Sequence, residues 1–350
     1  ASLLMMGIST SIIGILPPAA SAGVGVVIVL QLMRLAQCFG RGGTWGGGIL
    51  MAYENVPENK RSFYAAIPQI GLPIGFGLSS ILIAVPTLLL PEDIFFTWGW
   101  RIPFLAAIIL TVIVIRQKGE MMETEDYKKA QAKLEAEEAE GKKHKVGFIP
   151  MVKGYWKTLL LGCGTRWVDG TFYNIFIVWI LSYCINWLGM PLIQTYIITI
   201  IACIFKIPFT LFGGWCAQKL GNTRTFVIGA LASAVLSIPT LKVIELSKGN
   251  LAITIIGIVL GWSIAYNLIW AVISSLWSSY FETEVRYSGI SFVYHVPSFL
   301  VAGMVPTICT LLINYGKGDT IYVGIYSTVV ALISAACALA LKARHDRGEK

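Results

Sequence analysis

Long, continuously apolar stretches alternate with short polar segments along the whole chain. A helix of about 20 apolar residues crosses a hydrocarbon core of about 30 Å. In lipid only helices or closed barrels satisfy every backbone polar group, and barrel strands would give short alternating runs instead. The pattern therefore predicts an all-α membrane protein with ten apolar helices, eight of them long enough to cross comfortably. The predicted helices cover 1–16, 24–45, 64–90, 98–116, 157–185, 192–215, 225–241, 251–280, 287–313 and 320–341.

Lysine and arginine are distributed unevenly between the loops. Of the 27 basic residues, 19 lie on one set of loops and the C-terminal tail, whereas four lie on the other set and four lie inside apolar stretches. The positive-inside rule therefore places the loop 116–157 and the C-terminus in the cytoplasm. This bias accounts for the net charge of +8. We predict a multi-pass plasma-membrane protein in a lipid bilayer, with no nucleic-acid partner.

Composition supports the membrane class and disfavours a metal site. Hydrophobic residues make up 56% of the chain and charged residues 13%, with a mean hydropathy of +0.71, which would be extreme for a soluble domain. The seven cysteines have no metal-type spacing, and three histidines are too few for a multi-histidine site. We predict free packing thiols, and neither a metal nor a cofactor.

The chain is organised around one charge-rich segment at 116–157. Its middle is rich in Glu, Lys and Ala, which favours a solvated helical linker, with a regulatory docking site as the alternative. Four apolar stretches precede this segment and six follow it. The loops at 58–64 and 282–289 resemble each other and open the third and ninth stretches, which supports a repeat of six helices. The first stretch is short and lacks a signal-peptide pattern, so we expect two further helices upstream.

Several short runs carry a family resemblance. They are RLAQCF at 34–39, GGTWGG at 42–47, KRSFY at 60–64, PQIG at 68–71, WGWRIPF at 98–104 and VRYSG at 285–289. Together they resemble the metabolite:proton symporter group of the major facilitator superfamily, which includes proline/betaine, alpha-ketoglutarate, shikimate and citrate transporters. The run at 98–104 is the most specific of them.

The resemblance implies a fold of twelve helices in two pseudo-symmetric bundles, of which ten helices are present. Residues 1–116 would form the remainder of the N-terminal bundle, 117–156 a cytoplasmic linker, 157–341 the C-terminal bundle and 342–350 a cytoplasmic tail. This sequence departs from the group's pattern at Gly40-Arg41, which stands where small residues are usual, and at two further positions. Thr44 replaces a glutamate and Gln218 replaces an aspartate of the gate motif, so proton coupling and gating could both differ from the group.

Charged residues inside apolar stretches are the strongest candidates for a site, because charge is costly in lipid and marks transport pathways. Arg34 lies about ten residues into its stretch, or roughly 15 Å, and Arg41 follows on the same face. Arg166 and Asp169 are three residues apart, so an internal ion pair is the alternative to a substrate role. Lys206 could instead extend to the cytoplasmic surface, as could Arg41.

These cations outnumber the carboxylate, which favours an anionic substrate. The predicted substrate-binding residues are Arg34, Gln37, Arg166, Tyr173, Asn174 and Lys206. The candidates for proton coupling are Asp169 and His295, and those for gating are Arg101, Lys219, Arg224 and Arg286. Arg101 also suits an ion pair with Glu92 and Asp93.

The favoured function is secondary active transport of a small organic acid or zwitterionic metabolite by alternating access, coupled to protons, in a monomer. A transporter-like sensor and a uniporter or exchanger remain alternatives. An integral-membrane enzyme is disfavoured, because the dense carboxylates lie in the linker rather than at a membrane interface.

Overall fold

The protein is described by a computed structural model that covers residues 2–18, 22–54, 56–118, 148–298, 301 and 303–349. Across these ranges the regular structure is helical, as the apolar pattern predicts. The helices long and apolar enough to cross a bilayer are Arg61–Leu89, Met151–Asn186, Leu192–Leu220, Asn222–Leu246, Leu251–Tyr280 and Ile321–Asp346. Shorter apolar helices are Leu3–Ile15, Val24–Gly40, Gly99–Ile113 and Val305–Tyr315. The predicted all-α membrane class is confirmed. Most of the predicted linker lies outside the described residues.

The chain divides into two compact units. Unit 1 comprises Ala1–Gly48 and Leu78–Thr124, and unit 2 comprises Ile49–Gly77 and Glu125–Lys350. The helices that contribute to unit 1 are α1 (Ser2–Ile15), α3 (Val24–Glu54), α5 (Gly71–Leu89), α6 (Glu92–Thr97), η3 (Gly99–Arg101) and α7 (Ile102–Lys118). The beginning of α5, up to Gly77, and the end of α3, from Ile49, belong to unit 2.

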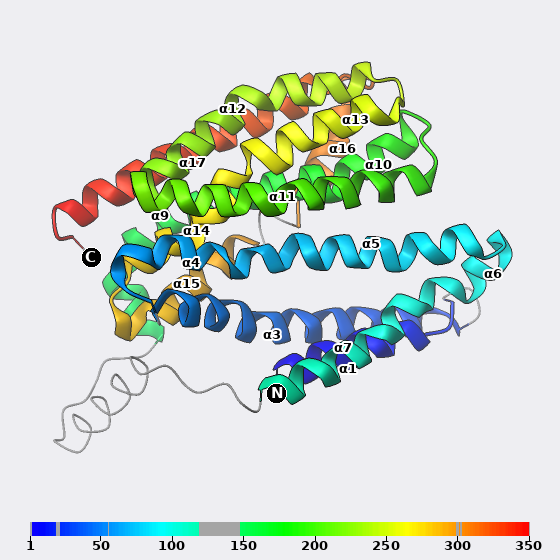
Figure 1. Ribbon diagram of the computed structural model, residues 1–350, viewed down its shortest axis with the longest axis horizontal. Coiled ribbons are helices and arrows are strands. Elements are labelled where there is room, and N and C mark those ends of the chain that lie inside the picture. Colours follow the sequence, from blue (N-terminus) through cyan, green and yellow to red (C-terminus); the bar gives the residue numbers. More distant parts are fainter. Residues whose placement is uncertain are drawn as a thin grey trace. The chain divides into compact units, whose positions relative to one another are not determined.

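In unit 1, α1 packs against α7, as Figure 1 shows. Arg101 donates hydrogen bonds from Nη1 to the carbonyl oxygens of Gly14 at 2.7 Å and Leu16 at 2.6 Å. The last carbonyls of a helix lack intrahelical donors and carry partial negative charge. Arg101 therefore stabilises the end of α1, and the predicted ion pair with Glu92 and Asp93 is replaced by these bonds.

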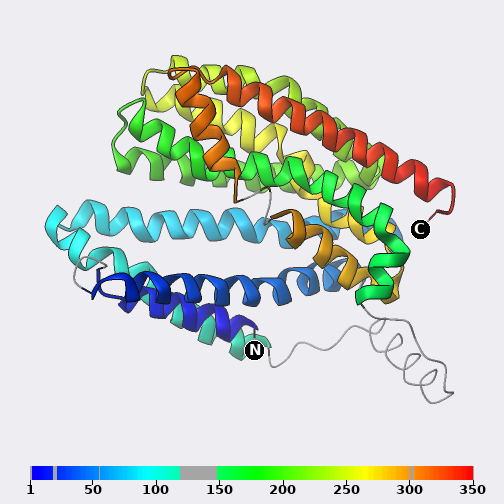
Figure 2. The ribbon, with the colours of Figure 1, turned by 180° about the vertical axis from the view of Figure 1, so that it is seen from behind.

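Unit 2 contains the remaining helices. They are η1 (Glu58–Lys60), α4 (Arg61–Ala66), η2 (Pro68–Ile70), α9 (Phe148–Asn174), η4 (Ile175–Trp179), α10 (Ile180–Asn186), α11 (Leu192–Leu220), α12 (Asn222–Leu246), α13 (Leu251–Ile258), η5 (Val259–Ala265), α14 (Asn267–Tyr280), α15 (Thr283–Pro297), α16 (Val305–Tyr315) and α17 (Ile321–Asp346). Within this unit α17 runs along α12 and α9, and α14 packs against α11 and α12 (Figures 1 and 2).

Two of the long spans in unit 2 contain a π-helical segment. The span that begins as α9 passes through η4 into α10, and the span that begins as α13 passes through η5 into α14. A π-helical turn inserts one extra residue into an α-helix, and such turns are frequent at functional sites. In both spans the segment lies beside the residues of the candidate site described below.

The predicted continuous helix at 287–313 is interrupted in the structure. It is described as α15, which ends at Pro297, and α16, which begins at Val305 with a proline at one of its first two positions. Proline lacks the N–H that the helix ladder needs and fits best in the first turn of a helix. Beyond Pro297, Ser298 and Val301 are π-helical, so the type of helix changes after α15, and the proline at the start of α16 fits the first turn of that helix.

A polar cluster joins α12 to the segment before α17. Lys242 Nζ lies 3.0 Å from Glu245 Oε1 and 2.7 Å from Asp319 Oδ1, and Glu245 Oε2 accepts from the N–H and hydroxyl of Thr320 at 2.8 and 2.7 Å. The Lys242 ammonium and the backbone N–H of Ile321 donate to Asp319 and hold the pKa of its carboxyl below its usual value.

This cluster predicts an acid-sensitive contribution to stability. A carboxyl whose pKa is lower in the folded protein stabilises it above the unfolded pKa, about 3.9, and loses this effect as pH falls through the folded pKa. The melting temperature of wild type in detergent should therefore exceed that of Asp319→Asn at about pH 6, and the difference should vanish in acid. Asp346→Asn, which removes an exposed pair with Lys342, is the control and should change little. A difference that does not depend on pH would contradict this interpretation.

Candidate functional site

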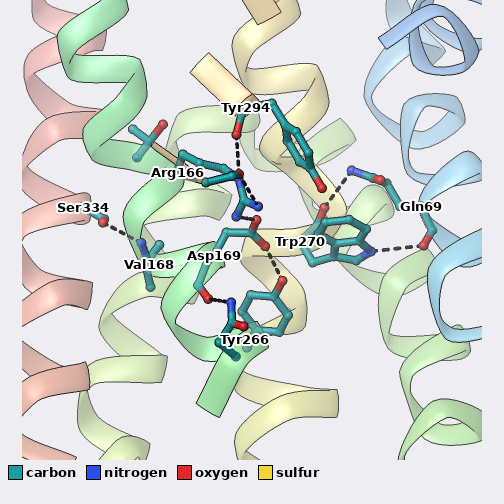
Figure 3. A network of polar contacts seen from close by, with 12 residues as sticks. Gln69, Arg166, Val168, Asp169, Tyr266, Trp270, Tyr294 and Ser334 are labelled. Atoms are coloured by element: carbon teal, nitrogen blue, oxygen red, sulfur yellow. Dashed lines mark hydrogen bonds and ion pairs between the residues drawn. The ribbon is translucent and has the colours of Figure 1, made fainter. Parts of the chain in front are cut away.

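The candidate site of unit 2 is built around Asp169 on α9. Asp169 is 1% exposed and Arg166 is 7% exposed, and they form the i,i+3 ion pair between Nη1 and Oδ2 that their spacing allows. Figure 3 shows the Asp169 carboxylate between Arg166 and Tyr266, whose hydroxyl donates to Oδ1. Both carboxylate oxygens are thus occupied by groups from two different spans.

Arg166 is also held by α15 and the residue that follows it. Its Nη2 donates to Ser298 Oγ at 3.3 Å, and its guanidinium carbon lies 4.4 Å from the ring centroid of Tyr294. Its Nε has no hydrogen-bond partner among the described residues. The guanidinium therefore keeps one buried donor that the ion pair does not use.

Lys206 on α11 is fully buried, with 0% exposure. Its Nζ lies 4.4 Å from the ring centroid of Trp262 and 4.2 Å from that of Tyr266, and has no hydrogen-bond partner among the described residues. The extension of Lys206 to the cytoplasmic surface, weighed as an alternative, does not occur here. The ammonium is covered by two aromatic faces instead.

The position of Lys206 is fixed by hydrogen bonds between α11 and the span that contains η5. Asn267 Nδ2 and Thr210 Oγ1 each donate to the Lys206 carbonyl at 2.8 Å, and Ser263 Oγ donates to the carbonyl of Ala202 at 2.8 Å. The bonds from Ser263 and Asn267 hold two successive turns of α11 against η5 and the start of α14, whereas the bond from Thr210 lies within α11. The backbone from which the Lys206 side chain extends is consequently fixed.

The other predicted residues of unit 2 lie around this cluster or apart from it. Tyr173 packs its ring edge-on to Phe76 at 5.8 Å, and Asn174 donates to the carbonyl of Gly170 at 2.8 Å within its own helix. His295 is half-buried, and its ring lies 5.0 Å from that of Tyr294, the residue that also covers Arg166. Of these three, His295 is connected to the Arg166 cluster by a shared neighbour.

Two predicted substrate residues lie in unit 1, on α3. Gln37 donates from Nε2 to Thr10 Oγ1 at 2.7 Å, and the Arg34 side chain is exposed within this unit. The side chains of Arg41 and Thr44 lie outside the described residues. The roles of Arg34 and Gln37 stay predictions.

The predicted gating residues of unit 2 lie near the ends of its helices. Arg286 donates from Nε to the Phe281 carbonyl at 3.1 Å and lies 5.8 Å from the Tyr53 ring centroid. Lys219 lies 4.2 Å from the ring centroid of Trp215, and Arg224 is exposed.

Gln218, the residue that replaces an aspartate, joins α11 to the segment leading into α4. Its amide nitrogen donates to the carbonyl of Asn59, and its amide oxygen accepts from the N–H of Phe63 at 3.3 Å. An amide can donate and accept at once, whereas an ionised carboxylate can only accept. Gln218 therefore makes a neutral contact in which one amide both donates and accepts a hydrogen bond.

Trp262, Tyr266 and Asn267 were not among the residues predicted from the sequence, although Trp262 and Tyr266 contact the buried charges and Asn267 bonds the Lys206 carbonyl. A signal was present in the sequence. Trp262 and Tyr266 are four residues apart and so share a helix face, and Asn267 is polar within an apolar stretch.

The helices and the buried charge define a polytopic membrane protein with a buried polar cluster. The model of the Major Facilitator Superfamily matches residues 1–306, and the chain belongs to this superfamily, as its motifs predicted. It is similar to the inner membrane metabolite transport protein YhjE of Escherichia coli K12, with 32% identity over 99% of this chain and 77% of that protein.

Two other relatives are consistent with the metabolite:proton symporter group of this superfamily. Identity is 30% with the shikimate transporter of Escherichia coli K12, over 97% of this chain and 76% of the relative. It is 27% with the proline/betaine transporter of Salmonella typhimurium, over 99% of this chain and 69% of the relative. The fold matches a structure of the proton:xylose symporter XylE bound to 6-bromo-6-deoxy-D-glucose, with a TM-score of 0.72 and 16% identity over 97% of this chain and 77% of that one. The protein is a multi-pass inner-membrane transporter of metabolites.

Proposed function

We propose that this protein moves a small organic acid or zwitterionic metabolite across the inner membrane by alternating access, coupled to protons. The relatives named above include transporters of shikimate, an acid, and of proline and betaine, which are zwitterions. Their names favour transport over catalysis.

The observation that carries the substrate class is the charge of the buried cluster. Arg166 and Lys206 contribute two cations, and Asp169 contributes one carboxylate. A buried cation without an anion is costly, and in membrane proteins such residues mark substrate or ion pathways. An anionic group on the substrate would complete the cluster.

Asp169 is the group that we propose to carry the coupled proton. It is the carboxylate that holds Arg166, so protonation would remove the ion pair and free the guanidinium for another anion. His295 is the second candidate, because it shares the neighbour Tyr294 with Arg166. Thr44 replaces a glutamate of the group's motif, but the Asp169 carboxylate is still present to carry a proton.

Gating would depend on contacts that open and re-form at the helix ends. In unit 2 the Gln218 amide and the Arg286 guanidinium make such contacts, and Lys219 and Arg224 lie close by in sequence. Because Gln218 does not titrate, its contact should be insensitive to pH. In unit 1 Arg101 is the corresponding candidate.

Uptake measurements test this function. The protein at its natural length, reconstituted in proteoliposomes, should accumulate labelled shikimate or glycine betaine when the exterior is acidic, and a protonophore should abolish accumulation. Empty liposomes are the control. Uptake that only equilibrates would indicate a uniporter, and uptake that requires internal substrate would indicate an exchanger. Binding without uptake would indicate a sensor.

A further inference from the structure

The buried ammonium of Lys206 is the least compensated charge of the described cluster. The Asp169 carboxylate already receives Arg166 on one oxygen and the Tyr266 hydroxyl on the other. Lys206 is left with two ring faces, at 4.2 and 4.4 Å. A cation–π contact contributes much less than the cost of removing a charge from water.

The indole N–H of Trp262 is a second unpaired donor beside the Lys206 ammonium. Trp262 is fully buried, its ring covers the Lys206 ammonium, and its Nε1 has no hydrogen-bond partner among the described residues. A buried indole N–H usually finds an acceptor. Two unused buried donors, one of them charged, therefore belong to side chains in direct contact.

The backbone around these donors is held in place independently of them. The hydrogen bonds from Ser263 and Asn267 to the carbonyls of Ala202 and Lys206 join the two spans that carry Lys206 and Trp262. The donors thus need only side-chain rotation to meet an acceptor, and binding does not have to order the helices first.

We infer that Lys206 and Trp262 together receive a single carboxylate group of the substrate. The described cluster has one positive charge in excess, which one carboxylate would neutralise, and two carboxylate oxygens can accept from the ammonium and the indole N–H. This inference rests on the proposed transport of organic acids or zwitterions. It assigns their shared carboxylate, rather than a hydroxyl or an ammonium, to this site.

The test compares an acid with its neutral ester. Affinities of the purified natural-length protein for shikimate and shikimate methyl ester, and for glycine betaine, are measured by equilibrium binding in detergent. Wild type should prefer the acid. Lys206→Met has a similar length without the charge, and should lose affinity for the acid by at least about 30-fold while leaving the ester little changed. The preference for the acid should then disappear.

Trp262→Phe keeps an aromatic ring near Lys206 but removes the N–H together with the five-membered ring of the indole. It should weaken binding of the acid by about 5- to 10-fold. Trp277→Phe is the matched control, because Trp277 is also fully buried but donates its N–H to Thr165 Oγ1 at 2.9 Å. It should leave the preference for the acid unchanged.

The outcomes separate this inference from the proposed function. If Lys206→Met keeps the wild-type preference for the acid, the inference is wrong and the transport proposal stands. An unchanged affinity in Trp262→Phe would exclude the two-donor site. If wild type binds neither shikimate nor glycine betaine, the proposed substrate class is contradicted together with the inference.

Discussion

Replacing Asp169 by Asn should abolish accumulation driven by a proton gradient while exchange of labelled for unlabelled substrate continues. Asparagine resembles a permanently protonated aspartate in shape and cannot release a proton. The change also leaves Arg166 and Lys206 buried without an anion, and breaking a buried pair in this way costs about 3–5 kcal/mol. Unfolding in detergent should therefore begin at a lower temperature, and bound substrate should restore part of the loss.

Glu245→Gln is the matched control for this variant. Glu245 also forms an ion pair in unit 2, with Lys242 Nζ at 3.0 Å, but it is partly exposed and lies in a separate cluster. Accumulation in the control should persist. If Asp169→Asn still concentrates substrate against its gradient, Asp169 does not carry the coupled proton, and His295 becomes the residue to test. Loss of exchange as well as accumulation, in folded protein, would mean that Asp169 is needed for substrate binding or movement itself and not only for proton coupling.

Replacing Gly213 or Gly214 by Val should destabilise unit 2. A Cβ added at Gly213 would lie 2.6 Å from Ala271 Cβ on α14, and one at Gly214 would lie 2.7 Å from Ala66 Cβ on α4. Small residues let helix backbones approach closely in membranes, and overpacking typically costs about 1–3 kcal/mol. Each variant should therefore unfold at a lower temperature and give less monodisperse protein on size exclusion.

Gly75→Ala is the control for these two substitutions. Gly75 lies inside α5 and a Cβ added there would meet no atom within 4 Å. Alanine is also the better helix former, by about 1 kcal/mol, so this variant should be neutral or slightly stabilised. Valine at Gly213 with wild-type stability would mean that α11 and α14 can separate without cost, contrary to their close packing.

The sequence predicted the site only in part, and the residues show why. The spacing of Arg166 and Asp169 allowed an ion pair within one helix, as the alternative to a substrate role, because positions three apart share a helix face. The third member, Tyr266, is 97 positions away in sequence from Asp169. Arg101 lies near two carboxylates in sequence, yet it binds carbonyls of α1, more than 80 positions away.

The sequence by itself determined the membrane class, the positions of most of the apolar helices and the superfamily. These follow from local properties, since the length of an apolar run and the identity of a short motif are independent of how helices pack. Only the tertiary structure decided which groups meet: the aromatic cover of Lys206, the unused N–H of Trp262 and the contact of Gln218 with Phe63 of α4. Such partners come from different helices, and packing between helices depends on the whole set of side-chain shapes rather than on any one stretch of sequence.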